Sequence, residues 1–420
     1  MKKSLLAVAA IGAFASAAQA QSSVTVYGIL DVGYVGSNTR VSGPTAVTKT
    51  QSSGFGQSAE TTSRLGFKGT EDLGNGTSAF FTAEFQLFPE DQTLSGNSTS
   101  KDAINANTQG STASSGGLLN RQTFVGLKKN GIGQFAVGTQ YTPVFNSGAA
   151  TSPGQFNNML GDVVYAGSTT AGNNGGGAVS TGFTNRTSNT LTIASEKFAG
   201  FGANLMWTQN NNNATQSSST VGGNTNASGW GIGADYTYKK FYVTAAYQAL
   251  KQLTSATSNG AVSGTAGTGN FAAWTGAQPS SGIAGSAMNV QDNQFLAGAT
   301  YDFGILKAYA QYVNRNATST MSSNYYVKRQ AEQIGVRSFI TPTIEAWASA
   351  GLGRYTAFGT GQPTANFNGW QIGSNYLLSK RTNLYAIYGQ QNFSNANAGT
   401  NYSTVSANAN NYAVGVRHTF

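Results

Sequence analysis

The 420-residue sequence contains no cysteine and a single histidine, and these absences exclude much of enzyme chemistry. Without cysteine there can be no disulfide framework, thiolate metal site or thiol nucleophile. His418 lies two residues from the end, so clusters of His and Cys ligands are excluded too. The Gly-rich run 172–177 lacks the lysine and the following helix of a phosphate loop. These observations predict that the protein is not an enzyme, binds no metal and needs no cofactor.

Charge and long apolar runs are also scarce. Charged residues make up 9% of the chain, against about 25% in ordinary soluble domains. Beyond the first 20 residues no apolar run reaches the roughly 20 residues of a transmembrane helix. Aromatic residues are too frequent, and net charge too small for this length, for a disordered chain. A β-barrel fits this combination, since only every second residue of its strands faces lipid.

The first 20 residues are predicted to be a signal peptide. Lys2-Lys3 forms a basic start, residues 5–15 form a short apolar stretch, and Ala18-Gln19-Ala20 suits a cleavage site. The mature barrel domain is then expected to cover residues 21–420 of an exported bacterial protein.

The two ends of the mature chain carry strands that are apolar on one face. Residues 411–420 alternate with period two over about the length of a tilted membrane-spanning strand. One face of this strand carries Tyr412, Val414, Val416, His418 and Phe420. Residues 23–34 alternate in the same way. Because open strand edges are not tolerated in lipid, the last strand is expected to pair with the first.

Between these ends the sequence repeats one unit, a hairpin with a tight turn followed by a long polar stretch. Residues 62–72 and 77–87 flank Asn75-Gly76, a dipeptide typical of β-hairpins. Further short turns occur near residues 130–133, 199–200, 239–240, 304, 341–342 and 379–382. The pattern predicts an all-β, 16-stranded antiparallel transmembrane barrel with short periplasmic turns and long extracellular loops.

The polar faces of the strands must line the lumen, which in a barrel of about 16 strands is a water-filled channel. Alternation places four basic residues inward, namely Arg64, Lys68, Arg121 and Arg186. We expect them to form one cationic wall. Further inward charged candidates are Asp31, Glu84, Asp235, Lys307, Arg337, Glu345 and Arg417.

Residues 142–185, the third long loop, are too apolar to remain in solvent. Phe145, Phe156, Met159, Leu160, Val163, Val164 and Tyr165 all lie in this segment. We expect the loop to fold into the lumen, pack on the inner wall and narrow the channel. Asp162 would then lie opposite the basic wall.

Four segments resemble the general diffusion porins of Gram-negative bacteria, most closely the β-proteobacterial type. They are Ser22-Ser23-Val24-Thr25-Val26-Tyr27-Gly28, Ser63-Arg64-Leu65-Gly66-Phe67-Lys68-Gly69-Thr70-Glu71-Asp72-Leu73-Gly74, Asn120-Arg121-Gln122-Thr123-Phe124-Val125-Gly126-Leu127 and Val416-Arg417-His418-Thr419-Phe420. The resemblance implies a homotrimer of outer-membrane barrels, each constricted by its third loop. It also implies that Arg64 and Arg121 belong to the basic wall and that Phe420 is recognised by the barrel assembly machinery. Outer-membrane lipid and lipopolysaccharide, small hydrophilic solutes and anions are the other expected partners, and nucleic acid is not.

Two positions depart from the family pattern. The third loop lacks the Pro-Glu-Phe-Gly-Gly signature, so Asp162 stands in for its acidic residue. Gly138-Thr139-Gln140-Tyr141 replaces the usual Gly-Arg-Gln-Tyr, which removes one basic residue.

The predicted function is passive diffusion of small hydrophilic solutes and ions, with a preference for anions. A substrate-specific channel of the same fold is the first alternative, with Trp347 or Tyr355 as candidate contacts for a solute. An exported adhesin or β-solenoid is the second. The segments have no fixed short period, which disfavours a solenoid.

Overall fold

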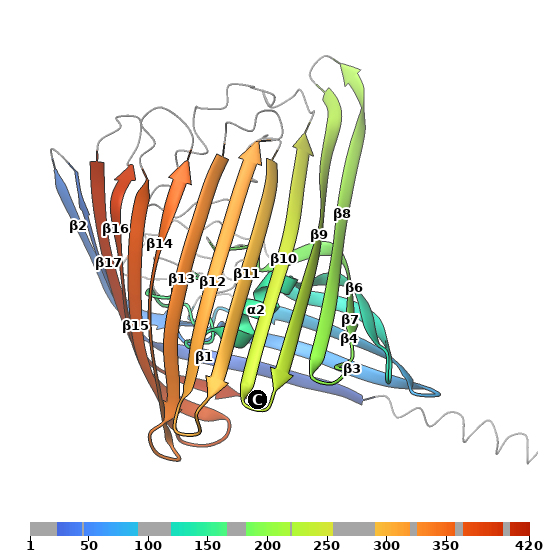
Figure 1. Cartoon of the computed structure of the whole chain (residues 1–420), viewed down its shortest axis with the longest axis horizontal. Coiled ribbons are helices and arrows are strands. Elements are labelled where there is room, and N and C mark those ends of the chain that lie inside the picture. Colours follow the sequence, from blue (N-terminus) through green and yellow to red (C-terminus); the bar gives the residue numbers. More distant parts are fainter. Residues whose placement is uncertain are drawn as a thin grey trace, which may run out of the picture.

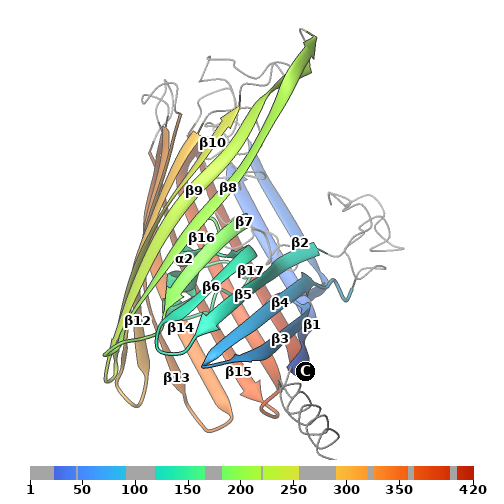
Figure 2. The same ribbon diagram turned by 90° about the vertical axis from the view of Figure 1, so that its right-hand side faces the viewer.

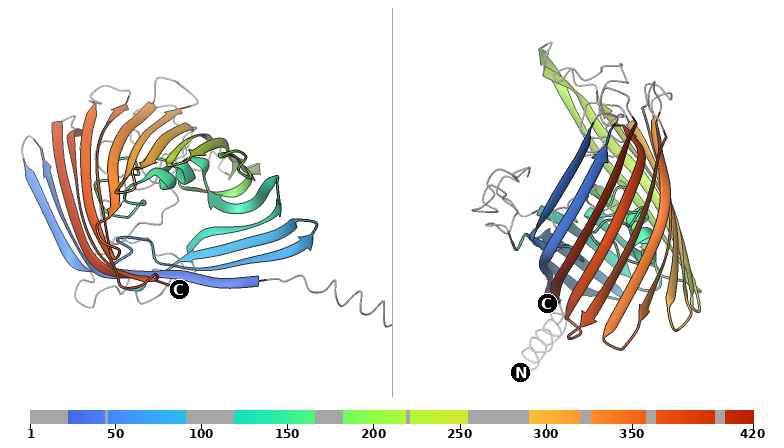
Figure 3. Two further views of the ribbon diagram at one scale, coloured as in Figure 1. Left: turned by 60° about the horizontal axis from the view of Figure 1, so that its bottom comes forward. Right: turned by 90° about the vertical axis from the view of Figure 1, so that its left-hand side faces the viewer.

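The computed structural model describes residues 23–43, 46–90, 119–165, 182–218, 221–254, 290–319, 326–357, 364–397 and 404–420. The predicted signal peptide lies outside these residues. Seventeen strands form one antiparallel sheet that closes on itself (Figures 1 and 3). The first half of the sheet contains β1 (Ser23–Ser42), β2 (Val47–Gln57), β3 (Arg64–Gly74), β4 (Thr77–Gln86), β5 (Leu119–Lys129), β6 (Gly133–Tyr141), β7 (Arg186–Ser195) and β8 (Phe201–Ser218). The second half contains β9 (Val221–Tyr238), β10 (Phe241–Thr254), β11 (Val290–Asp302), β12 (Lys307–Ser319), β13 (Tyr326–Phe339), β14 (Ile344–Ala357), β15 (Ala365–Leu377), β16 (Thr382–Asn397) and β17 (Thr404–Thr419).

The closed sheet confirms the predicted pairing of the last strand with the first. β17 runs antiparallel to β1 from Ile29↔Thr419 to Ser42↔Ser406. The number of strand positions around the wall is 16, as predicted, because β2 and β3 occupy one position. Both pair with the same edge of β1, β2 with its second half and β3 with its first.

Two of the polar stretches between the predicted hairpins are extended strand pairs and not long loops. β1 and β2 continue as a hairpin up to Ser42↔Val47, and β8 and β9 remain paired from Asn210↔Ala227 to Ala214↔Gly223. In Figures 1 and 2, β8 and β9 rise beyond the neighbouring strands. The sequence of the projecting part of this strand pair is rich in Asn, Ser and Thr and has no apolar alternation, so the pattern could not reveal the strands.

The wall has two faces, as the alternation predicts. Val125, Ile334 and Val414 are more than half exposed on the outer face. Their inward neighbours along the same strands are mostly polar and buried, such as Gln333. Several aromatic residues lie at the turn end of the barrel, including Tyr238, Tyr301, Phe303 and Tyr376, and are at least two-fifths exposed.

The third loop folds into the lumen, as predicted. It begins with helix α2 (Pro143–Thr151), whose N-cap Thr142 accepts a hydrogen bond from the backbone N–H of Phe145. Figure 3 shows α2 and the following segment inside the ring of strands. The predicted apolar residues bury against the inner wall, where the largest cluster joins loop residues Phe156, Val163, Val164 and Tyr165 to wall residues Leu296, Val313 and Phe367.

The wall also supplies hydrogen-bond partners for the backbone of this buried loop. The Gln333 side chain accepts from the N–H of Val163 at 2.9 Å, and the Gln371 side chain donates to the carbonyl of Leu160 at 2.8 Å. Arg329, 1% exposed, donates to the carbonyl of Val163 and stacks on Phe367. Buried backbone groups must be paired, so these inward polar residues let the loop remain in the lumen.

Candidate functional site: the constriction of the lumen

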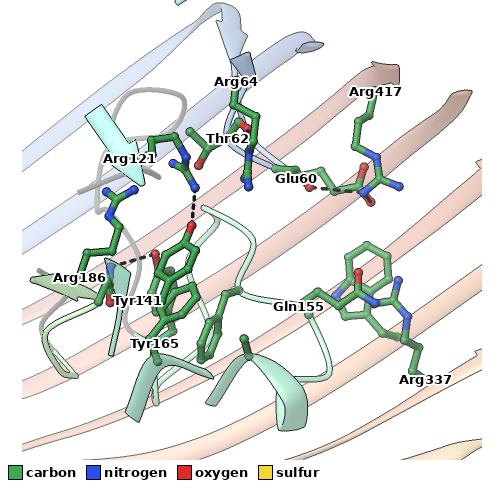
Figure 4. A pocket seen from close by; sticks show the side chains of 17 residues that line it. Glu60, Thr62, Arg64, Arg121, Tyr141, Gln155, Tyr165, Arg186, Arg337 and Arg417 are labelled. Carbon is green, nitrogen blue, oxygen red and sulfur yellow. Dashed lines mark hydrogen bonds and ion pairs between the residues drawn. The ribbon is translucent and has the colours of Figure 1, made fainter. Parts of the chain in front are cut away.

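The narrow part of the lumen is a cavity of about 340 Å³ between the third loop and the wall (Figure 4). Its lining combines the first strands of the wall, the loop and the later strands. The lining residues are Glu60, Thr61, Thr62, Arg64, Arg121, Tyr141, Phe145, Ala149, Gly154, Gln155, Phe156, Tyr165, Asn185, Arg186, Arg337, Trp347 and Arg417.

Three of the four predicted basic residues lie together on one side of this cavity. Arg64 begins β3, Arg121 lies in β5 and Arg186 begins β7 (Figure 4). Arg121 sits at a break in the register between β4 and β5. A bulge of this kind re-aims a side chain, and here it turns Arg121 inward although Val125 and Leu127, of the same parity, face outward.

The strands between these arginines carry residues that hold the guanidinium groups apart. Glu84 of β4 accepts from Nε of Arg121 at 2.8 Å and lies 3.7 Å from Nη1 of Arg64. Tyr141 of β6 accepts from Nη2 of Arg121 at 2.8 Å, and its ring lies 5.7 Å from the Arg186 guanidinium. This arrangement orders the basic row across five neighbouring wall strands.

Two further arginines line the cavity from the later strands. Nη2 of Arg337 lies 2.5 Å from Glu345, and its guanidinium stacks on Trp347 at 4.9 Å. Nη1 of Arg417 lies 3.5 Å from Glu60. Alternation along the strands had predicted only that Arg337, Glu345 and Arg417 face inward.

The charge balance of the constriction is therefore cationic. Five guanidinium groups line the cavity, and three carboxylates pair with four of them, namely Glu84, Glu345 and Glu60. Nη1 of Arg121 and Nη1 of Arg186 are buried without a hydrogen-bond partner among the described residues. Low-dielectric walls concentrate the field of such charges inside a narrow pore.

Lys68 and Asp162 do not line the cavity. Lys68 lies on the same face of β3 as Arg64 but closer to the turn, where it is exposed and its ammonium lies over the Tyr27 ring at 5.5 Å. Asp162 turns into the loop instead of toward the arginines. Its carboxylate accepts from the N–H groups of Val164 and Tyr165 at 3.0 and 2.9 Å.

Asp162 is buried because it organises its own turn. Burial raises the pKa of its carboxyl, and the hydrogen bonds from the Tyr165 and Val164 backbone and from Ser152 act in the opposite direction. Composition placed Asp162 in a loop that enters the lumen, but it could not show that the loop's own backbone binds the side chain. The carboxylate that lines the cavity is Glu60, which had been missed because it lies between β2 and β3, outside the alternating pattern of the strands.

Phe420 closes the barrel. Its N–H donates to the carbonyl of Gly28 at 3.1 Å, and its own carbonyl accepts from the Gly28 N–H at 3.0 Å. A Cβ at Gly28 would lie 2.3 Å from the Phe420 ring, so the aromatic ring covers the glycine. Recognition of Phe420 by an assembly machinery remains a prediction.

In the described residues no helix has the length and apolar character to span a membrane. Within the same residues no group of three or more His, Cys, Asp and Glu side chains could hold a metal ion.

Comparisons with known proteins agree with this architecture. The family model described as Gram-negative porin matches residues 7–397. Outer membrane porin protein 32 of Delftia acidovorans is 45% identical over 96 residues, which cover 23% of this chain and 25% of that protein. An outer membrane porin protein of Bordetella pertussis is 38% identical over 147 residues, which cover 33% of this chain and 34% of that protein. These matches thus span about a quarter to a third of the length of either relative.

Solved structures extend the likeness to nearly the whole chain. An anion-selective porin from Comamonas acidovorans superposes with a TM-score of 0.62 at 20% identity, covering 95% of this chain and all of that one. The Salmonella typhi OmpF complex with daunomycin gives 0.54 at 17% identity, covering 94% of this chain and 97% of that one. At these identities the likeness establishes the shared fold.

Proposed function

Because the chain belongs to the Gram-negative porin family, we propose that it is an outer-membrane channel for passive diffusion of small hydrophilic solutes and ions, with a preference for anions. The observation that carries the proposal is the row of Arg64, Arg121 and Arg186 on one side of the constriction. Selection then rests on pore width and on the charges that line the pore, without a cofactor or an energy source. The name of one structural neighbour, an anion-selective porin, is in keeping with this preference.

The proposal extends to the assembly and export of the protein. We propose that the protein forms a homotrimer in the outer membrane, where it contacts lipid and lipopolysaccharide. We also propose that residues 1–20 are a signal peptide that is cleaved during export. In the same proposal, a barrel assembly machinery recognises Phe420 and inserts the barrel into the membrane. The family assignment and the closing contact of Phe420 with Gly28 support this part.

The test is the reversal potential in planar bilayers under a KCl gradient. The wild type is expected to prefer chloride, and Arg64→Gln with Arg121→Gln is expected to weaken that preference. Lys68→Gln is the matched control, because it removes an inward basic charge outside the cavity and should change the potential less. A cation-selective wild type would contradict the proposal, and so would a double variant with wild-type selectivity.

A substrate-specific channel is the second candidate, and Trp347 is the observation in its favour. The indole lines the cavity beneath the Arg337 guanidinium, so an aromatic ring and a charge lie together at the pore. Current that saturates with the concentration of one solute class, and loses saturation in Trp347→Ala, would favour this candidate over general diffusion.

A further inference from the structure

The wall contains a break that the fold does not require. On β1, only Leu30 and Asp31 separate the residues that pair with Gln57 and Arg64. On the facing strands, six residues (58–63) lie between Gln57, which ends β2, and Arg64, which begins β3. We call residues 58–63 the inward segment, since three of them line the cavity in the lumen, namely Glu60, Thr61 and Thr62.

Asp31 anchors the inward segment from the position opposite the break. Its side chain is fully buried, and one carboxylate oxygen accepts from the N–H groups of Glu60 and Thr61 at 2.9 and 2.6 Å. The other oxygen accepts from the Tyr385 hydroxyl at 2.6 Å. The Asp31 backbone carbonyl accepts from the N–H of Ser58 at 2.8 Å. Three donors converge on this one buried carboxyl group and a fourth reaches the Asp31 carbonyl, so this residue determines where the segment lies.

The third loop docks on the same segment. The Asn158 side chain donates to the Ser58 carbonyl at 2.6 Å, and its backbone N–H donates to the Ala59 carbonyl at 3.0 Å. Ser58 itself has a left-handed backbone, with φ of 60°, which few non-glycine residues adopt. The contacts with Asp31 and Asn158 hold Ser58 in this unusual backbone conformation, which indicates that the position of the turn matters for function.

The inward segment brings a carboxylate to the cationic cavity. Glu60 lies 3.5 Å from Nη1 of Arg417 and accepts from the Asn383 side chain at 3.0 Å (Figure 4). Thr61 Oγ1 accepts from the same Arg417 nitrogen at 3.3 Å. The segment therefore provides the acidic side of the constriction, the role that composition had assigned to Asp162 in the third loop.

We propose that the inward segment is a second constriction element beside the third loop, that Asp31 is its positioning residue, and that Glu60 determines the degree of ion selectivity. This inference rests on the proposed channel function and identifies a part of the same site. It predicts that Glu60 limits the anion preference that the five arginines create.

The first experiment compares Glu60→Gln with Asp162→Asn by reversal potential under a KCl gradient. Both changes remove a buried carboxylate and keep the shape of the side chain. Glu60→Gln is expected to shift the potential further toward the chloride equilibrium value, because the field in the cavity loses its negative contribution. Asp162→Asn is expected to leave the potential at the wild-type value. An unchanged potential in Glu60→Gln would overturn the assignment, as would a larger shift in Asp162→Asn.

The second experiment tests the position of the segment with a single thiol, which the cysteine-free chain allows. Thr61→Cys channels are inserted in a bilayer and treated with a methanethiosulfonate reagent that carries a sulfonate. The chloride current is expected to fall, whereas treated Asn75→Cys, with its thiol in the β3–β4 turn, should keep its current. Unchanged current in treated Thr61→Cys would overturn the placement of the segment in the pore.

Asp31 is tested with Asp31→Asn and the milder Tyr385→Phe, which leaves all charges in place. Both are expected to reduce the effect of the thiol reagent on Thr61→Cys, because the segment loses hydrogen bonds that keep residue 61 in the pore. Heat-modifiable mobility in gels identifies folded barrels, and folded Tyr385→Phe with an undiminished effect would overturn the positioning role. A wild type without channel current would refute the proposed function instead, so the two failures are distinguishable.

Discussion

At the scale of single residues, the two faces of a strand differ in what they tolerate. Val414 of β17 is half exposed on the outer face, and Thr82 of β4 faces the lumen near Lys68. Val414→Arg should impair insertion at a cost of about 2–4 kcal/mol near the bilayer midplane. Thr82→Arg should fold normally and change conductance. Folded yield, measured as heat-modifiable protein in the outer membrane, separates the two, and equal behaviour would contradict the assignment of faces.

The arginines show a second residue-scale effect, which is the importance of local partners. Arg121 has a hydrogen-bonded carboxylate and a phenol beside it, whereas no ion pair of Arg186 is found among the described residues. Glu84 lies between Arg64 and Arg121, and its negative charge offsets the repulsion between the two guanidinium groups. Removing one partner of such a group leaves a buried charge unpaired, which costs more than the pair contributes.

At the scale of elements, the third loop depends on inward amides of the wall. Gln371 is fully buried and bonds the Asn157 side chain at 2.6 and 3.0 Å as well as the Leu160 carbonyl at 2.8 Å. Gln371→Leu leaves loop groups unsatisfied and should destabilise the docked loop by about 1–3 kcal/mol for each group. We expect a lower unfolding temperature and noisier open-channel current.

Gln390 of β16 provides the matched control for the loop, because its amide bonds only Asn392 among the described residues. Gln390→Leu should leave the open-channel current quiet. Equal current noise in Gln390→Leu and Gln371→Leu would show that the wall amides do not hold the loop.

The closing strand pair is the second element on which the fold depends. Deletion of Phe420 removes two backbone hydrogen bonds to Gly28 and the ring that covers this glycine. The folded yield is expected to fall, while the channels that do assemble should conduct normally. Phe420→Tyr, which keeps the ring and both backbone hydrogen bonds, should restore the yield. Wild-type yield after the deletion would contradict a role in closure or assembly.

At the scale of the whole molecule, overall charge is a poor guide to selectivity. The chain carries a formal net charge of +9, but exposed charges are screened within about 8 Å at physiological salt. Anion preference should therefore decline steeply between about 0.1 and 1 M KCl, as the screening length falls from about 10 to 3 Å. The measurement is the permeability ratio at a fixed gradient over several mean concentrations. A ratio independent of salt would point to steric selection instead of selection by charge.

The sequence by itself determined the features that depend on local periodicity. Alternation along a strand is a property of neighbouring residues, so it predicted the barrel, the closing pair and the inward direction of Arg64. The apolar content of residues 142–185 similarly predicted a loop that needs a wall to pack on. Both predictions were confirmed because the hydrophobic effect is non-directional: an apolar face or segment is buried whichever residues it packs against.

Only the tertiary structure decided features that depend on register between distant strands. The break at residues 58–63 becomes visible when β1 shows which residues face each other, and Arg121 points inward through a bulge against β4. For the same reason the carboxylate that lines the cavity is Glu60, for which no role had been predicted, and not Asp162. Hydrogen bonds from segments far along the chain, or from the loop's own turn, determine where each carboxylate points, and no local pattern encodes those partners.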